Sequence, residues 1–175
     1  PKQYKGKHVW LTFNGINYRA DIWVNGHQVA DSSRVSGMFR RFRFDITPYI
    51  LPGEKNCVAV KIYQVDHPGD PEPGTQFEVF GTTRGHATDI FKDETLKMSG
   101  GWDCAPVVRD RNMGIYQGVF VEATGDVAVE HPYVTITLPL PDTSRADIRI
   151  KAELSNLSGH PVKGRLVANI QLLNE

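Results

Sequence analysis

Residues 8–26, HVWLTFNGINYRADIWVNG, decide the fold class of this sequence. At their start, Val9, Leu11 and Phe13 recur at every second position, which is the period of a β-strand with one buried face. At their end, Asn25-Gly26 follows an apolar run, and both residues tolerate the positive φ angles of a two-residue hairpin turn. The stretch therefore predicts antiparallel strands, a tight turn, and a core face made by Val9, Leu11 and Phe13.

The period of two recurs along the rest of the chain. Residues 58–63 alternate, and residues 147–154 (DIRIKAEL) place apolar side chains on one face and charged ones on the other. Residues 166–172 repeat the pattern, and turn residues such as Pro52-Gly53 separate the runs. Because no stretch carries a sustained apolar stripe of period 3.6, we predict an all-β fold, a sandwich or jelly roll with little helix.

The 175 residues are enough for one domain and part of another. A boundary is expected near Thr124-Gly125-Asp126, after a closing strand at 115–123. We predict a jelly-roll domain over 1–125, which can lack its first strands in this sequence, and part of a second β-sandwich over 126–175. The second segment offers about four strands where a whole sandwich needs roughly seven (127–130, 133–138, 147–154 and 166–172). We therefore expect both ends to be cuts through a longer protein.

The charge balance argues against nucleic acid as a partner. Lys and Arg total 20, as do Asp and Glu, so the formal net charge is zero and the basic excess of a nucleic-acid binder is missing. No apolar run approaches the roughly 18 residues that a membrane helix needs, so we expect no membrane partner. Neutral polyols such as sugars fit this balance.

Metal and disulfide chemistry have weak signals. Cys57 and Cys104 form no CxxC or zinc spacing, and two free thiols are favoured over one disulfide. The six histidines are scattered, so we expect no metal site and no cofactor. A structural calcium held by Asp66, Asp70 and Glu72 is the less favoured alternative.

Two long irregular segments carry the strongest functional signal. Residues 67–74 (HPGDPEPG) cannot form a central strand, and residues 81–106 are polar without a clear period. Long loops inside a compact domain are usually functional or disordered, and Trp102 with the run after it favours a functional loop. Trp102 can pack its face on the apolar side of a pyranose, and Asp103 can accept hydrogen bonds from two sugar hydroxyls. The alternative is a Trp buried for packing beside an Asp that caps a turn.

Several segments together resemble the sugar-binding domain of glycoside hydrolase family 2. The first three are 13–26 (FNGINYRADIWVNG), 37–47 (GMFRRFRFDIT) and 53–60 (GEKNCVAV). Two more, 101–103 (GWD) and 109–116 (RDRNMGIY), resemble the β-mannosidase and exo-β-glucosaminidase branch. Cys104 departs from that branch, which usually has a second Trp there, so the specificity of this protein is expected to differ.

The resemblance implies a galactose-binding-like jelly roll, then an immunoglobulin-like sandwich, then a (β/α)₈ barrel with two catalytic Glu residues. Retaining hydrolysis needs two carboxyl groups about 5–5.5 Å apart, and nothing in this chain resembles barrel strands. The terminal Asn174-Glu175 matches the family's acid/base dipeptide but follows an alternating strand pattern, so it is rejected. We therefore expect the parent protein to be a retaining, exo-acting β-glycosidase and the chain alone to be inactive. Its partners are expected to be the catalytic barrel and a β-linked glycan, and its compartment to be periplasmic or extracellular.

In the resembling family, the loop that matches Trp102 reaches the barrel's pocket and contacts the terminal sugar. The resemblance therefore implies substrate-binding roles for Trp102, Asp103, Asp110 and Asn112. A salt-bridged loop that only braces the Trp102 segment is the alternative for residues 109–112. Trp10 and Trp23 are interpreted as core or inter-domain packing rather than as a sugar platform. A free-standing carbohydrate-binding module or a structural β-sandwich is the alternative for the whole chain.

Overall fold

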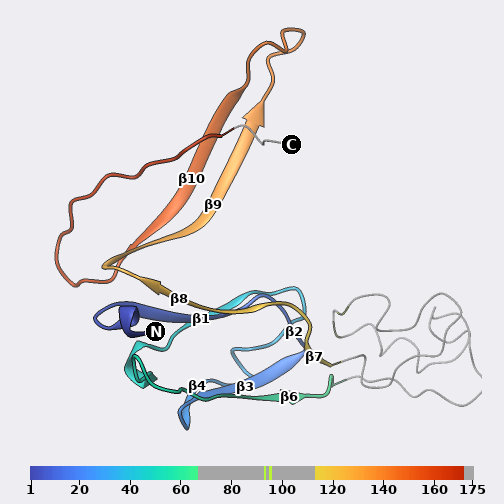
Figure 1. Cartoon of the computed structure of the whole chain (residues 1–175). Coiled ribbons are helices and arrows are strands. Elements are labelled where there is room, and N and C mark those ends of the chain that lie inside the picture. The colour runs from blue at the N-terminus through green and yellow to red at the C-terminus, as the bar shows by residue number, and fades with distance from the viewer. Residues whose placement is uncertain (67–92, 94, 96–112, 172–175) are drawn as a thin grey trace, which may run out of the picture. The chain divides into compact units, whose positions relative to one another are not determined.

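The computed structural model describes residues 1–66, 93, 95 and 113–171 (Figure 1). The chain divides into two compact units, unit 1 over Pro1–Ala123 and unit 2 over Thr124–Glu175. In the described residues, the only helices are two 3₁₀ turns, η1 (Lys2–Tyr4) and η2 (Thr47–Tyr49). The prediction of an all-β fold is confirmed.

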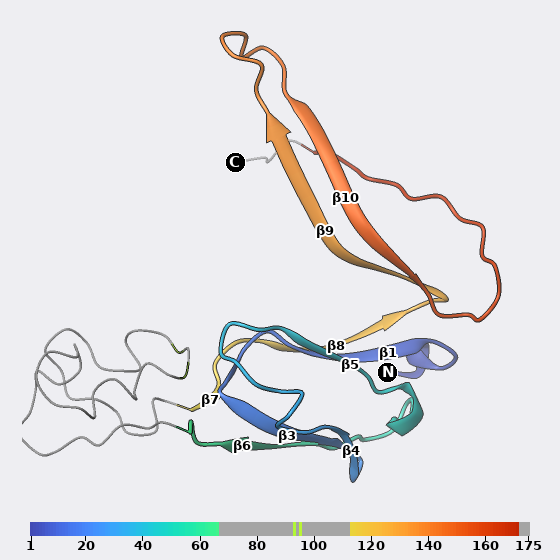
Figure 2. The same ribbon diagram turned by 180° about the vertical axis from the view of Figure 1, so that it is seen from behind.

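The described residues of unit 1 form two three-stranded sheets and one short strand pair. The first sheet has the order β5 (Phe42–Asp45), β1 (His8–Phe13), β8 (Val119–Thr124). The second has the order β4 (His27–Ala30), β3 (Arg19–Val24), β6 (Val58–Tyr63), and β2 (Ile16–Asn17) pairs with β7 (Gly114–Ile115). Figures 1 and 2 show the two larger sheets as facing layers, which is the arrangement of a sandwich.

The core of unit 1 lies between these layers. Val9, Leu11 and Phe13 of β1 are at most 1% exposed, as the sequence pattern predicted. Burying a side chain of this size stabilises a fold by roughly 1.5–3 kcal/mol. The rest of the cluster comes mainly from β3 and β5 and from the segments beside them: Ile16, Ala20, Ile22, Val24, Ala30, Val35, Phe42, Phe44 and Ile46.

The predicted turn at Asn25-Gly26 is confirmed. Asn25 has φ 48° and Gly26 has φ 84°, the left-handed pair that joins β3 and β4. The Asn25 side chain also bridges to the start of β6, because its Nδ2 donates to the Tyr49 carbonyl and its Oδ1 accepts from the Cys57 amide, both at 2.8 Å. One residue therefore sets a turn and positions a neighbouring strand.

The predicted closing strand at 115–123 is wrong in part, because the structure has two strands there. β7 ends at Ile115 and β8 begins at Val119. The break is held from outside: the Gly118 carbonyl accepts from the Asn14 amide at 3.1 Å, and the Tyr116 hydroxyl donates to the Met38 carbonyl at 2.6 Å. These contacts hold the segment that connects β7, paired with β2, to β8 in the first sheet.

The described part of unit 2 contains a long antiparallel hairpin of β9 (Val127–Thr137) and β10 (Asp147–Asn156). The two predicted strands at 127–130 and 133–138 are one strand with a bulge, where His131 has φ 50°. In β10 the apolar residues keep a strict period of two. In β9 the large aliphatic side chains change from odd positions (127, 129) to even positions (134, 136). The bulge absorbs this change, so that both pairs share a face with the apolar residues of β10.

The predicted strand at 166–172 is not observed over its described part. Residues 161–171 have no strand assignment and pair with no strand among the described residues. Alternation shows which side chains would share a face, but a strand also needs a neighbour for its backbone hydrogen bonds.

Candidate functional site

The predicted substrate-binding residues Trp102, Asp103, Asp110 and Asn112 all lie outside the described residues. What the structure describes is the place where the chain leaves and re-enters unit 1 on either side of them. The register of two strand pairs locates this place, since Asn17 lies opposite Gly114 and Arg19 lies opposite Tyr63. Only Tyr18 separates the two pairings.

We call Asn17, Arg19, Tyr63, Asp66 and Gly114 the loop base. The end of β6 and the start of β7 lie at the same end of unit 1 (Figures 1 and 2). The described chain therefore ends at Asp66 and resumes at Met113 within one small region of unit 1, while Asp93, described between them, is buried.

Polar contacts fix the β6 side of the loop base. The Arg19 guanidinium forms an ion pair with the Asp66 carboxylate, and both side chains are partly exposed. The Tyr63 hydroxyl donates to Asp21 Oδ2 at 2.5 Å, and Asp21 Oδ1 accepts from the Ser32 amide at 2.7 Å. These bonds tie the last residues of β6 to β3 and to the turn after β4.

On the β7 side of the loop base, the absence of a side chain at Gly15 allows Tyr116 to pack closely. A Cβ atom on Gly15 would lie 2.5 Å from a ring carbon of Tyr116, whose hydroxyl is anchored on Met38. Asn17, two positions along, is fully buried beside the core residue Ile16. The FNGIN stretch therefore needs its glycine so that the Tyr116 ring can pack closely. The role of Gly15 was not predicted from the sequence, because neither the FNGIN stretch nor the segment around Tyr116 indicates that the two are in contact.

The two described tryptophans are not core residues, so that part of their interpretation is wrong. Trp10 and Trp23 are half-buried and lie on the faces of β1 and β3 opposite the core. The Arg43 guanidinium carbon lies 3.9 Å from the centre of the Trp10 ring. A stacked cation occupies one ring face, so Trp10 makes a poor platform for a sugar.

The structure describes only some of the residues on which the expectations about metals and thiols depend. Asp66 is engaged with Arg19, while Asp70 and Glu72, its proposed calcium co-ligands, lie outside the described residues. Within the part of the chain that is described, no group of three His, Cys, Asp or Glu side chains is arranged to hold a metal. Cys57 is an exposed free thiol, and Cys104 is not described.

Two exposed carboxylates have lowered pKa values, and both belong to turns. The Ser33 hydroxyl and amide donate to Asp31 Oδ1 at 2.5 and 3.0 Å and lower the pKa of that carboxyl. Ser144 lowers the pKa of Asp142 in the same way, with donor distances of 2.6 and 2.9 Å. Both carboxylates stabilise local turn geometry.

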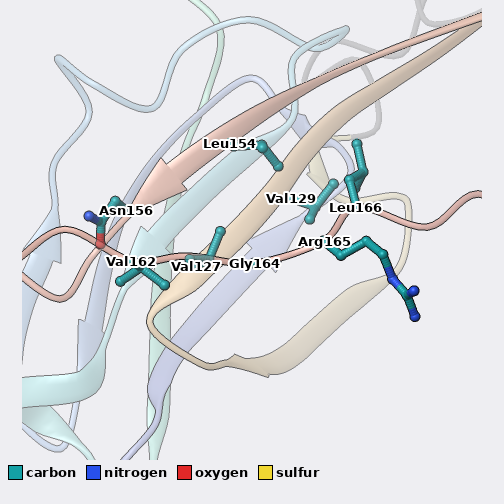
Figure 3. Close-up of a pocket in the computed structure, with 8 residues that line it drawn as sticks. All are labelled: Val127, Val129, Leu154, Asn156, Val162, Gly164, Arg165 and Leu166. Atoms are coloured by element: carbon teal, nitrogen blue, oxygen red, sulfur yellow. The ribbon is translucent and has the colours of Figure 1, made fainter.

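Unit 2 contains an apolar cavity of about 460 Å³ (Figure 3). Its lining comes from β9, β10 and the segment after β10: Val127, Val129, Leu154, Asn156, Val162, Gly164, Arg165 and Leu166. These eight residues include no carboxylate and no aromatic ring. The lining therefore has no aromatic face on which a pyranose could stack, and its only polar side chains are those of Asn156 and Arg165.

A comparison with protein families gives a clear result. Residues 1–117 match the model described as "Glycosyl hydrolase 2 galactose-binding domain-like". The chain belongs to this glycosyl hydrolase 2 family. The resemblance noted in the sequence is thereby confirmed, and unit 1 is a galactose-binding-like domain of glycosyl hydrolase 2.

Relatives of this glycosyl hydrolase 2 domain are large glycosidases. The chain is 37% identical over 130 residues to a mannosylglycoprotein endo-beta-mannosidase from Lilium longiflorum, covering 73% of this chain and 12% of the relative. It is 32% identical over 163 residues to an exo-beta-D-glucosaminidase from Amycolatopsis orientalis, covering 93% and 13%. The chain therefore spans about an eighth of the length of these relatives.

The solved structures agree on the fold of the glycosyl hydrolase 2 domain. The crystal structure of an exo-chitosanase from Amycolatopsis orientalis superposes with a TM-score of 0.60 at 28% identity, over 86% of this chain and 14% of that one.

Among the described residues, the structure contains no helix with the length and hydropathy of a membrane span.

Proposed function

We propose that this chain is a non-catalytic part of a glycosidase, in which unit 1 supports the catalytic domain and presents residues 67–112 to the substrate. The observation that carries the proposal is the loop base, where both connections to that segment meet within a few residues of β2 and β3. Catalytic and binding groups need placement within about 0.5 Å, which a sheet-borne base supports better than two separate attachments.

The proposed substrate contacts are Trp102, Asp103, Asp110 and Asn112. Trp102 would stack on the apolar face of a pyranose, and Asp103 would accept hydrogen bonds from its hydroxyls. The substrate would be a β-linked glycan, because the similar enzymes are named for β-mannosidase and β-glucosaminidase activities. Both an endo-acting and an exo-acting enzyme occur among them, so the mode of cleavage is not part of the proposal.

Asp103→Ala in the full-length glycosidase that contains this chain tests the proposal. We expect kcat/KM to fall by about a hundredfold, since a charge-assisted hydrogen bond to the substrate is lost. The matched control is Asp147→Ala, which removes an exposed carboxylate from β10 of unit 2. Thermal unfolding of both variants should match the parent. Unchanged kinetics in Asp103→Ala, with the same folded state, would remove Asp103 from the site.

The isolated chain separates this proposal from a free-standing carbohydrate-binding module. We expect no turnover of aryl β-glycosides and no micromolar binding of neutral sugars by calorimetry. The stacking of Arg43 on Trp10 supports this expectation, because it occupies an aromatic face on the outside of the first sheet. Micromolar binding of a neutral sugar would favour the module, and measurable hydrolysis would contradict a non-catalytic role.

A further inference from the structure

A groove of about 400 Å³ runs along β5 in unit 1 and is rich in arginine. We call it the arginine groove, and its lining residues are Ser33, Arg34, Arg40, Arg41, Phe42, Arg43 and Phe44. Four of these seven side chains carry a positive charge and none carries a negative one. A concentration of one sign in a concave surface attracts the opposite charge.

Aromatic rings hold three of the four guanidinium groups, although the Arg43 side chain lies with Trp10 on the face of the sheet opposite the buried Phe42 and Phe44. The Arg34 guanidinium carbon lies 5.7 Å from the centre of the Phe44 ring, that of Arg40 lies 5.1 Å from Phe42, and that of Arg43 stacks on Trp10. Stacking uses the face of a guanidinium and leaves its N–H edge available for hydrogen bonds. The arrangement orients donors before any ligand is present.

Arg40 is fixed most firmly. Its Nη1 donates to the Ser36 carbonyl at 2.9 Å. Its stem lies over Gly37, where an added Cβ would come within 3.0 Å of Arg40 Cδ, and Gly37 has φ 105°. A guanidinium carries five N–H donors, and the bond to Ser36 is made by one of its three nitrogens. Binding of an oxyanion at Arg40 would therefore cost little side-chain entropy.

Acidic groups border the arginine groove but do not neutralise it. The Asp31 carboxylate accepts from the Ser33 and Arg34 amides, and Glu122 Oε2 lies 3.9 Å from Arg43 Nε. These two carboxylates face Arg34 and Arg43. Arg40 and Arg41 are both exposed, so the centre of the groove keeps a positive charge.

Protection of an edge strand explains only part of this pattern. β5 lies at an edge of its sheet among the described strands, and charged side chains there discourage pairing with other chains. Stacking on Phe42 and Phe44 also explains Arg40 and Arg34. Neither reason accounts for the exposed Arg41 or for a groove between the arginines.

We propose that the arginine groove binds the anionic group of an acidic saccharide, a uronate carboxylate or a sulfate ester. The volume of about 400 Å³ is within the usual range for small-ligand sites, roughly 300–1,000 Å³. Seven lining residues are too few for a stable protein interface, which uses about 20–30 on each side. The choice of a saccharide as carrier rests on the proposed function, whereas the anion site does not.

Calorimetry on the full-length protein tests the proposal with four probes: glucuronate, glucose 6-sulfate, glucose and inorganic sulfate. We expect saturable binding of the two acidic sugars, weaker binding of sulfate and none of glucose. Added NaCl should weaken binding, because exposed charges are screened. Arg41→Gln should weaken it about tenfold through loss of a charge-assisted contact. Arg145→Gln, which removes an exposed charge from unit 2, should leave it unchanged.

The outcomes test the anion site and the saccharide assignment separately. Absence of saturable binding by acidic sugars, or equal affinity in Arg41→Gln and the parent, overturns the anion site. Binding of inorganic sulfate as tight as that of the acidic sugars overturns the saccharide assignment alone. Asp103→Ala should leave affinity at the arginine groove unchanged, so a failure of the proposed substrate contacts is recognised separately.

Discussion

The side-chain amide of Asn25 donates a hydrogen bond to Oδ1 of Asn56 at 2.8 Å, joining the β3–β4 turn to the turn before β6. Asn56 Oδ1 also accepts from the Leu51 amide at 2.8 Å, and its Nδ2 donates to the Leu51 and Glu54 carbonyls at 3.0 and 3.1 Å. One amide side chain thus closes the turn at Pro52-Gly53 and attaches it to the second sheet.

Replacement of Asn56 should therefore destabilise unit 1. We expect Asn56→Ala to lower the free energy of unfolding by about 1–3 kcal/mol, because several hydrogen bonds in partly solvated positions are lost together. Asn56→Asp keeps the acceptor and loses both Nδ2 donors, so its effect should be smaller. Urea denaturation measures both. Equal stability of Asn56→Ala and the parent would show that these bonds only replace bonds to water.

Gly15→Ala should destabilise the same unit for a steric reason. The added methyl group would lie 2.5 and 2.6 Å from two ring carbons of Tyr116 and 2.9 Å from its hydroxyl oxygen, which is held by Met38. Overpacking of this kind costs about 1–3 kcal/mol. In a Tyr116→Leu background the same change should cost much less. A double-mutant cycle measured by denaturation gives the coupling, and additive effects would contradict the proposed contact.

Ser33→Ala should raise the pKa of Asp31 toward its ordinary value. The Ser33 hydroxyl is the largest cause of the lowered pKa, followed by the Ser33 amide, which the alanine variant keeps. A lowered carboxyl pKa stabilises the folded state above the unfolded-state pKa and loses this effect as pH falls below about 4. The variant should therefore show a weaker dependence of stability on pH in that acidic range.

NMR titration of the side-chain carboxyl groups measures this change directly. Ser144→Ala is the matched control, because it should raise the pKa of Asp142 and leave that of Asp31 unaltered. An Asp31 pKa that does not respond to Ser33→Ala would contradict the assignment of the hydroxyl as the main cause.

His131→Gly should stabilise the β9–β10 hairpin or leave it unchanged. At φ 50°, a residue with a Cβ is strained by roughly 1 kcal/mol, which glycine relieves at some cost in chain entropy. His131→Val should destabilise by more than 1 kcal/mol, because a β-branched residue disfavours this region. Amide hydrogen exchange across β9 reports both effects. Slower exchange in the valine variant than in the glycine variant would contradict a left-handed bulge residue.

Period-two patterning predicted individual strands well where both ends carried a signal. β1 contains the alternating Val9, Leu11 and Phe13 that predicted it, and β10 extends the predicted 147–154 by two residues. The reason is that alternation reflects burial of one face and needs no knowledge of the partner. The Asn25-Gly26 turn was equally accessible, since its backbone angles restrict which residues can occupy it.

The features that depend on a partner could not be predicted in this way. The break between β7 and β8 is held by Asn14 and Met38, which lie far away in sequence. The alternation at 166–171 has no neighbouring strand to complete it among the described residues. For the candidate site, the family resemblance predicted Trp102 and Asp103 as substrate contacts. The loop base and the Gly15–Tyr116 contact were found only in the structure.

The bulge at His131 also determines where this hairpin can change in length during evolution. Residues gained or lost at the tip, between Thr137 and Asp147, leave the register of both strands intact. A single residue lost at the bulge would turn Val127 and Val129 to the opposite face from Leu154. Insertions and deletions should therefore accumulate at the tip, while the spacing between Val129 and Val134 stays constant.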